Sequence, residues 1–393
     1  MKTQMVRNAV LALAGLLALT LYILACTSFS PDDTKVLYPT FDPSSGAVGI
    51  AVYDRETGRS ETLFVPVAYE GKETNTITPL LLRSQWLADG RNIVLAWPAG
   101  DGDNGLNLAM LPWPARAPVR LFSLPSVEQP GSRLMFPLCI VGHRLFVMET
   151  DSQVLRVDLR TGDLARHKFD TDSGKLSLLE APDGSGVLYL AENDQSGKKY
   201  TFGRLNLDML ALMPLMTFTN EPAPGSFLAF DGRAQRVAFV QEHDDQRQLL
   251  VLEKGAPVFT RPLGAKGEKR DFGSAAFSPR GDAICASFAH IPKGGTNASY
   301  GLVEIPLSDA PVRQVTLLST AESGDDANAL LFQAGISHDG ATAAAASTYL
   351  ACQIKELKPE DCALFLVDLK DPELKAAKVP IPMPPRRPAT VVK

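Results

Sequence analysis

Strong charge of either sign is missing from this sequence. Its 39 Lys and Arg residues nearly balance its 44 Asp and Glu residues, and the formal net charge is -5. Binding to nucleic acid requires clustered basic residues that neutralise phosphates, so the composition argues against a nucleic-acid partner. Hydrophobic residues make up 45% of the chain and charged residues 21%, a balance typical of a folded globular protein rather than a disordered one.

The motifs of several enzyme classes are also missing. The sequence has no Gly-x-Ser-x-Gly nucleophile elbow and no His-Glu-x-x-His zinc motif. The glycine-rich residues 264–269 lack the Lys-Ser or Lys-Thr pair of a phosphate-binding loop. Histidines are few and lie in separate parts of the chain, which favours solvated loop positions: His143, His167, His243, His290 and His338. The sequence therefore indicates a non-enzymatic protein.

The N-terminus has the form of an export signal. Lys2 and Arg7 precede an uncharged apolar run over residues 9–25, which is long for a signal peptide and barely long enough to cross a bilayer. Basic residues before such a run stay in the cytoplasm. The body of the protein is thus expected on the outer side of the cytoplasmic membrane.

The apolar run ends at a cysteine, Cys26. Ile23, Ala25 and Cys26 resemble the bacterial lipobox, whose cysteine becomes acylated, although Leu24 stands where a small residue is usual. The resemblance implies a lipoprotein signal over residues 1–25 and lipidation of Cys26; an uncleaved signal anchor and plain secretion are the alternatives. Thr27 gives no Asp-type retention signal, which by the enterobacterial sorting rule favours the outer membrane.

A turn followed by a short apolar strand recurs along the chain about every 50 residues. Clear copies are residues 86–97, 277–288 and 336–347, and the first copy is placed at residues 41–54. A second signal, a strand ending in Asp-x-x-Thr-Gly, follows at Asp54 and Asp158. Each copy has a glycine that suits the left-handed position of a tight turn: Gly46, Gly90, Gly142, Gly184, Gly232, Gly281 and Gly340.

This spacing fits one propeller blade of four strands per copy. We therefore predict an all-β fold, a β-propeller with seven four-stranded blades, with six and eight blades as alternatives and two β-sandwiches as the competing architecture. The expected organisation is a signal peptide or anchor over 1–25, a short tether over 26–35, the propeller over 36–382 and a proline-rich extended tail over 383–393. Residues 379–381 are candidates to close the ring by pairing with the first blade.

The turn-strand copies resemble the TolB-type, WD-repeat-like propellers of bacterial envelopes. Their Ser-Pro-Asp-Gly turn is matched in part by residues 278–281, 337–340, 181–184 and 88–90. The resemblance covers roughly residues 36 to 380, and the separate N-terminal α/β domain of TolB is not seen. Because such propellers have many roles, the resemblance implies the fold and not the function.

Two cysteines, Cys352 and Cys362, bracket a charged segment between apolar strands. In an exported protein this arrangement predicts a Cys352–Cys362 disulfide at the base of a hairpin, with two buried thiols as the alternative. Cys139 and Cys285 lie in strands of different repeats and are expected to be small buried apolar side chains.

A short acidic loop contains Asp101 and Asp103, which alternate with glycine as in a calcium loop. The twelfth position holds Pro112 instead of the bidentate Glu that such loops need. Calcium at Asp101 and Asp103 is therefore a secondary hypothesis, and no cofactor is otherwise expected.

From these features we expect a propeller anchored to the membrane in the cell envelope, facing the periplasm or cell surface, that binds a partner protein or serves assembly. The alternative is a small-ligand- or metal-binding propeller enzyme or sensor, lactonase-like, with its site in the central channel.

Overall fold

The computed structural model describes most of the chain from Thr27 to Ile381: residues 27–42, 47–64, 83–98, 106–114, 120–124, 135–150, 152–169, 175–180, 186–193, 199–223, 228–231, 233–266, 268–291, 297–321, 332–347 and 363–381. These residues form strands and turns without a helix, and they include no helix long and apolar enough to cross a membrane.

The strands form seven four-stranded antiparallel sheets, which we call blades A to G. Blades A to C are β1 (Ser28–Phe29), β2 (Lys35–Asp42), β3 (Ala47–Asp54), β4 (Arg59–Phe64); β5 (Arg83–Trp86), β6 (Asn92–Pro98), β7 (Leu106–Pro112), β8 (Arg120–Leu124); and β9 (Met135–Val141), β10 (Arg144–Thr150), β11 (Gln153–Asp158), β12 (Leu164–Lys168). Blades D to G are β13 (Lys175–Glu180), β14 (Val187–Asn193), β15 (Lys199–Leu205), β16 (Leu212–Phe218); β17 (Leu228–Phe230), β18 (Arg236–His243), β19 (Gln246–Glu253), β20 (Ala256–Pro262); β21 (Lys269–Phe277), β22 (Ala283–Ile291), β23 (Asn297–Pro306), β24 (Arg313–Ala321); and β25 (Phe332–Ile336), β26 (Thr342–Ser347), β27 (Ala363–Asp368), β28 (Ala376–Pro380).

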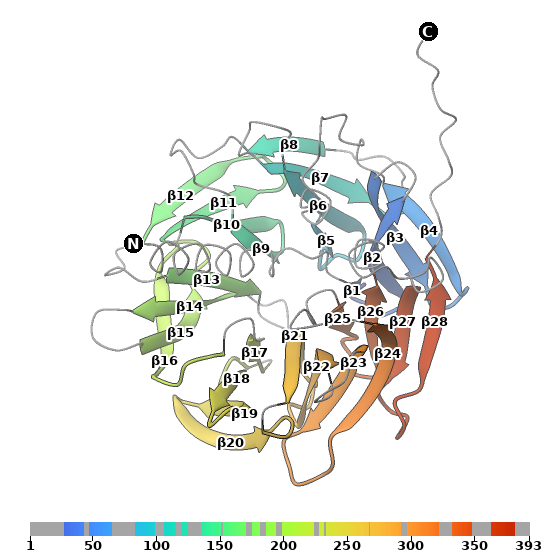
Figure 1. Ribbon diagram of the computed structural model, residues 1–393. Coiled ribbons are helices and arrows are strands. Elements are labelled where there is room, and N and C mark those ends of the chain that lie inside the picture. Colours follow the sequence, from blue (N-terminus) through green and yellow to red (C-terminus); the bar gives the residue numbers. More distant parts are fainter. Residues whose placement is uncertain are drawn as a thin grey trace, which may run out of the picture.

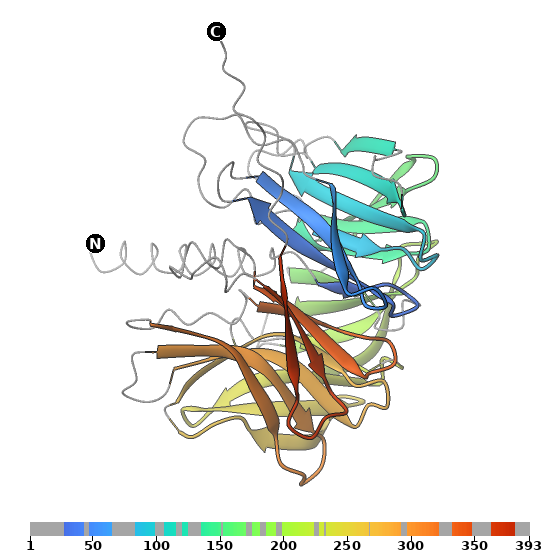
Figure 2. The same cartoon turned by 90° about the vertical axis from the view of Figure 1, so that its right-hand side faces the viewer.

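The blades are arranged around a central axis, with the first strand of each blade innermost and the fourth outermost (Figure 1). Turned by 90°, the strands are seen to run between the two faces of the ring (Figure 2). The sequence prediction of a seven-bladed all-β propeller is confirmed.

Neighbouring blades share their hydrophobic cores. Each of the seven clusters of buried apolar residues joins two successive blades, and one of them joins blade G to blade A. Strand β18 shows how the period of two achieves this: Phe239 packs toward blade D, while Val240 packs toward blade F. Since every blade buries both its faces against neighbours, no blade has a complete core alone.

The turn between the first and second strands of each blade lies on one face of the ring, which we call the turn face. In several blades a glycine adopts the left-handed backbone conformation at this turn, for example Gly281 at φ 69°. In blade A the turn is instead Pro31–Thr34, with Asp33 at φ 57°, and in blade E the position is taken by Ala234 at φ 54°. The first copy predicted at residues 41–54 was therefore misplaced, because the corresponding turn of blade A has Asp33 and not glycine in the left-handed position.

Blade A begins inside the segment predicted as a tether over residues 26–35. Ser28 pairs with Leu37 and Phe29 with Val36, so that β1 is the innermost strand of the first blade. The signal segment 1–25 and the tail 383–393 lie outside the described residues.

In the described part of the chain, no strand is exchanged between the first and last blades. The prediction that residues 379–381 pair with the first blade is wrong: β28 pairs with β27, with Val379 opposite Leu364. Val379 and Ile381 nevertheless pack beside the cluster of Phe29, Tyr38 and Ala344 that joins blades G and A. Side-chain packing and polar contacts thus hold the first and last blades together.

The outermost strands of blades A, D, E and F each contain a β-bulge that leaves one residue without a partner across the strand pair. The extra residues are Leu63, Leu215, Val258 and Leu317. Such a bulge bends the strand and redirects one side chain. Leu63 turns into the core between blades A and B, whereas Leu215 and Val258 are exposed.

Candidate functional site

All the site residues predicted from the sequence lie outside the described residues. This applies to the lipidation site Cys26, the disulfide pair Cys352 and Cys362, and the calcium candidates Asp101 and Asp103. These assignments stay predictions. Cys139 and Cys285 are buried as expected, and burial raises the pKa of the Cys285 thiol to about 12, which makes it chemically inert at neutral pH.

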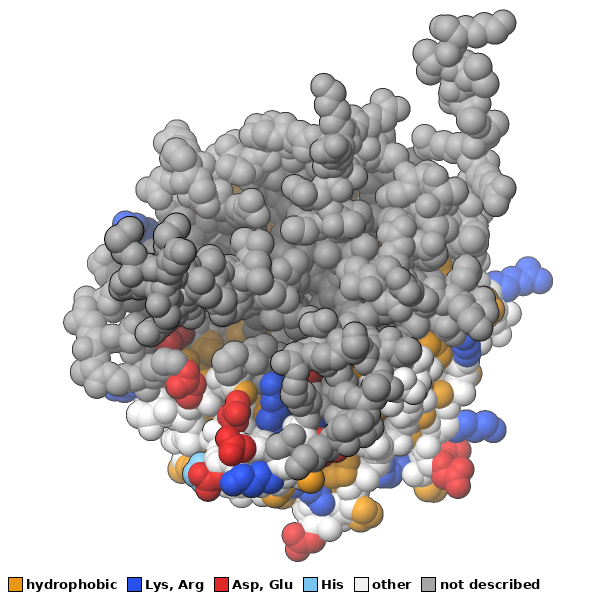
Figure 3. Space-filling model, in the orientation of Figure 1, with side chains coloured by type: hydrophobic (Ala, Val, Ile, Leu, Met, Phe, Trp, Pro, Cys, Tyr) orange, Lys and Arg blue, Asp and Glu red, His pale blue; other side chains and the backbone are white. Residues whose placement is uncertain are grey.

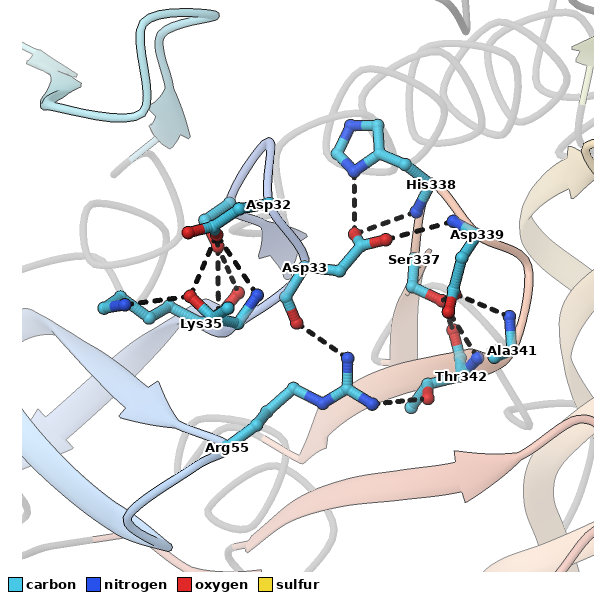
Figure 4. A network of polar contacts seen from close by, with 11 residues as sticks. Asp32, Asp33, Lys35, Arg55, Ser337, His338, Asp339, Ala341 and Thr342 are labelled. Atoms are coloured by element: carbon cyan, nitrogen blue, oxygen red, sulfur yellow. Dashed lines mark hydrogen bonds and ion pairs between the residues drawn. The ribbon is translucent and has the colours of Figure 1, made fainter.

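A polar cluster joins blades A and G on the turn face (Figure 4). Asp33 Oδ1 accepts the backbone N–H of His338 at 2.9 Å and lies 2.7 Å from His338 Nδ1, while Asp33 Oδ2 accepts the N–H of Asp339 at 3.0 Å. Arg55 donates to the carbonyl oxygen of Asp33 at 2.7 Å and to Thr342 Oγ1 at 2.8 Å. Since blades A and G share no strand among the residues of 27–381 that the structure describes, these contacts help to hold the two blades together. We call this cluster the polar latch, and its role is structural.

The neighbouring carboxylate, Asp32, is held by its own turn. Its Oδ1 accepts the hydroxyl of Ser30 at 2.5 Å, the N–H of Thr34 at 3.1 Å and the hydroxyl of Thr34 at 2.9 Å. The hydrogen bond from the Ser30 hydroxyl is the main cause that lowers the pKa of Asp32 to about 2. Burial opposes it, and the hydrogen bonds from Thr34 and the charge of Lys35 lower the pKa further.

This depressed pKa predicts acid sensitivity at the first turn. A carboxyl with a lowered folded-state pKa stabilises the fold above its unfolded pKa of 3.8 and loses that contribution as the pH falls toward 2. Replacing Asp32 with Asn should therefore lower the melting temperature at pH 7 and flatten its decline between pH 4 and pH 2. Thermal unfolding followed by circular dichroism across this range measures both; parallel profiles for the two proteins would contradict the assignment.

The face opposite the turn face carries a second ionic cluster, at the junction of blades E and F. Glu268 Oε1 lies 2.5 Å from His290 Nε2, and both side chains are largely buried. Burial alone would raise the pKa of the Glu268 carboxyl, but the N–H of Ala265, His290 and Arg270 outweigh it and hold that pKa below its usual range. Arg270 stacks on the ring of Phe288 and is itself largely removed from water, which lowers its pKa.

A carboxylate beside an imidazole is a combination that general bases use, but within the described residues His290 Nε2 makes no hydrogen bond of normal geometry, only the close contact with Glu268. The pair also has a plain structural role: Glu268 Oε2 accepts the N–H of Ala265 at 2.8 Å and so closes the loop before β21. The sequence predicted that His290 lies in a solvated loop, but it lies in β22 and is largely buried. No sequence motif near His290 indicated that Glu268 would be its partner.

The outer rim of blades C, D and E carries exposed large apolar side chains. Among the described residues these are Leu164 at 40%, Met209 at 69%, Met213 at 43%, Leu215 at 48% and Val258 at 54% exposed. They belong to the outermost strands or adjoining turns of three consecutive blades (Figure 1); we call them the C–E rim. Beside Met213, a groove of about 280 Å³ is lined by Val187, Leu205 and Asp208.

Charged side chains on the described part of the face shown in Figure 3 include acidic and basic groups lying close together, with no broad field of one sign. Within the described ranges, no three His, Cys, Asp or Glu side chains come together as metal ligands. The described surface thus offers apolar contact on the C–E rim more clearly than it offers a charged or metal site.

Comparisons with known proteins identify the fold. No protein-family model matches the chain, and no curated protein matches its sequence. A chain in the crystal structure of the mitotic checkpoint complex is 16% identical, with a TM-score of 0.51 over 83% of this chain and 84% of that one. A Bacteroides fragilis protein described as a 6-phosphogluconolactonase is 12% identical, with a TM-score of 0.51 over 88% and 94%. At these identities the likeness supports the propeller fold and nothing finer.

The sequence analysis missed the C–E rim, the polar latch and the Glu268–His290 pair. The rim could have been sought in the Met-Pro-Leu-Met segment of residues 213–216, which is apolar without strict alternation. No sequence pattern indicated the polar latch, because Asp33 and His338 are far apart in the sequence and come together only when the ring closes.

Proposed function

We propose that this chain is a membrane-anchored propeller of the bacterial cell envelope that binds another protein through the C–E rim. The observation that carries the proposal is the exposure of five large apolar side chains on three consecutive blades. Large apolar side chains left exposed on neighbouring parts of a surface favour a protein interface, and methionine is enriched at interfaces. TolB-type membership, through the partial Ser-Pro-Asp-Gly turns, is part of the same proposal.

The bulges strengthen the case for the rim. Leu215 and Val258 occupy equivalent positions in blades D and E, and both are exposed, whereas the equivalent Leu63 of blade A is buried. The fold therefore does not require an apolar side chain pointing to water at this position. An outermost strand also presents backbone groups along its free edge, so that a partner can combine apolar contacts with backbone hydrogen bonds.

The rim can be tested with a photo-crosslinking amino acid at Thr217, which is exposed on β16 beside the rim. In living cells this position should give a discrete adduct with an envelope protein. Replacing Met213, Leu215 and Val258 together by Ser should reduce its yield about tenfold or more, since each apolar contact contributes on the order of 1 kcal/mol.

A matched control is the pair Thr316→Ala and Ser319→Ala, two exposed positions on β24, the outermost strand of blade F. This variant should leave the adduct unchanged. Both variants should keep the wild-type melting temperature, because the substituted side chains are on the surface. An adduct that survives the triple substitution at full yield would refute the rim as the interface.

A second candidate function, a small-ligand-binding or enzymatic propeller, is favoured only by the Glu268–His290 pair with Arg270 beside it. This site would suit an anionic or proton-donating ligand at the face opposite the turns. Calcium at Asp101 and Asp103 belongs to this alternative. Metal analysis of the purified protein separates the two: stoichiometric calcium or zinc would favour the ligand-binding function.

A further inference from the structure

The groove beside Met213 lies at the turn-face end of blade D, and we call it the blade D groove. It includes Gly186, just before β14, and residues 206–208 of the β15–β16 turn, and its floor contains the buried side chains of Val187 and Leu205. Pockets that hold whole small molecules measure roughly 300–1,000 Å³, whereas this groove measures about 280 Å³. Its size suits one or two side chains of a partner protein better than a complete metabolite.

A cation without a partner lies in this groove. Leu188, Arg204 and Met213 stand directly opposite one another on β14, β15 and β16, so that their side chains form one row across the sheet. Arg204 is half-buried in this row. In the part of the chain that the structure describes, its guanidinium has no ion pair and donates no hydrogen bond. The positive charge of Arg204 is therefore free to bind an anionic group from outside.

The other charged groups near the groove are already paired. Arg144 Nη1 lies 2.7 Å from Asp208 Oδ1. Arg156 Nη1 donates to the carbonyl oxygens of Leu207 and Asp208, at 3.0 and 3.2 Å. The carboxylate of Asp208, which lines the groove, is thus bound by Arg144 and not by Arg204. The groove keeps a net positive charge next to apolar surface.

Equivalent positions in other blades show that the fold does not require an arginine here. The bulges of the outermost strands align the blades residue by residue. Val52 of blade A and Leu302 of blade F take the position of Arg204, and they are 1% and 0% exposed. In blade E the position is taken by Glu253, which stands opposite Arg236 on the neighbouring strand. Only in blade D, among these four blades, does an arginine stand there.

We propose that the blade D groove binds a segment of a partner protein in which an acidic side chain, Asp or Glu, is next to a large apolar one. The carboxylate pairs with the guanidinium of Arg204, whose planar fork matches it, and the apolar side chain packs on Met213, whose flexible thioether adapts to its shape. This proposal rests on the protein-binding function of the C–E rim and names the chemistry that the rim recognises.

The role of Arg204 can be tested with the photo-crosslinking amino acid at Thr217 in living cells. Arg204→Met should lower the yield of the adduct about tenfold, because it removes charge-assisted hydrogen bonds. Arg204→Lys should lower it less, about threefold, because lysine keeps the charge but loses the fork. Arg204→Met should keep the wild-type melting temperature, since apolar side chains occupy the equivalent positions of blades A and F.

Arg280→Met is the matched control. Arg280 is 86% exposed in the first turn of blade F, where its pair with Asp282 contributes little to stability, and its substitution makes the same change in net charge. This variant should leave the adduct unchanged. A full yield of adduct in Arg204→Met would overturn the proposal, even if the triple substitution of the rim abolishes the adduct and so supports the protein-binding function. No adduct in the wild-type protein would refute both.

Peptides of defined sequence test the chemistry of the partner directly. The full chain, purified in detergent with ¹³C-labelled methionine methyl groups, is titrated with acetyl-Gly-Leu-Glu-Leu-Gly-amide and with the same peptide carrying Gln in place of Glu. The Glu peptide should shift the methyl resonance of Met213 and bind about fivefold or more tightly than the Gln peptide. The methyl resonance of Met110, which lies on β7 of blade B, should not move. In Arg204→Met the two peptides should bind equally.

A third peptide separates the two sources of a carboxylate. Acetyl-Gly-Leu-Gln-Leu with a free C-terminal carboxylate offers a chain end in place of an acidic side chain. If it binds more tightly than the Glu peptide, the groove recognises a C-terminus, and the proposed acidic side chain is wrong. Equal affinity of the wild-type protein for the Glu and Gln peptides would also overturn the proposal.

Discussion

Replacing Arg166 with Met is expected to lower the free energy of unfolding by about 3 kcal/mol. The carboxylate of Glu149 is fully buried in blade C, and Arg166 Nε donates to both its oxygens, at 3.0 and 3.1 Å. Gln153 donates the remaining bond, at 2.9 Å. Without Arg166, the buried carboxylate of Glu149 keeps the hydrogen bond from Gln153, whose side chain is neutral. The expected loss is at the low end for a buried pair, because Arg166 is itself partly exposed and water can take its place.

The cause of this loss can be isolated with a second substitution. Glu149→Gln in the Arg166→Met background removes the buried charge but keeps a polar side chain that Gln153 can reach. Chemical denaturation of the two single variants and the double variant gives the coupling energy. We expect the double variant to recover most of the stability lost by Arg166→Met. A double variant less stable than both single variants would show that the charge pair is not what matters at this position.

Replacing Asp33 with Gly is expected to destabilise the protein by about 2 kcal/mol through the loss of charge-assisted hydrogen bonds between blades. Glycine is the residue best suited to the left-handed backbone at this position, φ 57°, so local strain cannot account for a loss. The carboxylate is only 15% exposed and accepts the backbone N–H groups of His338 and Asp339. The loss should therefore come from the contact between blades A and G.

Hydrogen exchange shows where the effect lies. In the Asp33→Gly variant, amides of β2 and β26 should exchange about tenfold or more faster, while amides of blades C and D change less. Ala234→Gly is the matched control, since it places glycine at the equivalent left-handed turn of blade E. The substitution relieves backbone strain but removes a buried methyl group. Its net effect on stability and on exchange rates should therefore be close to zero. Uniformly faster exchange in all blades would contradict a local latch.

The fold was predictable because its signals are local. Turn glycines and short apolar strands recur at blade spacing, and Asp54 and Asp158 cap their turns as the Asp-x-x-Thr-Gly pattern indicated, each accepting two backbone N–H groups. The start of blade A was not predictable in this way, since Asp33 takes the conformation for which the pattern expects glycine.

Several polar contacts within and between blades could not be predicted, for a different reason. Arg261 donates to three carbonyl oxygens near residues 306–310 of the next blade, and Arg313 reaches carbonyl oxygens of Leu369 and Asp371. Their partners are backbone atoms, which carry no side-chain signature. The Glu149–Arg166 and Glu268–His290 pairs join residues 17 and 22 positions apart whose spacing matches no motif.

Because each sheet is built from one uninterrupted stretch of polypeptide, a gene duplication or deletion that respects blade boundaries would add or remove a whole sheet without dividing any other. The joint between blades G and A is chemically distinct but topologically equal to the remaining six. During synthesis at the ribosome, blade A can complete its four strands early and need not wait for the C-terminal segment to supply one. Evolution of ring size in such a protein is then limited by how well successive sheets pack and not by the sharing of a strand between the two ends.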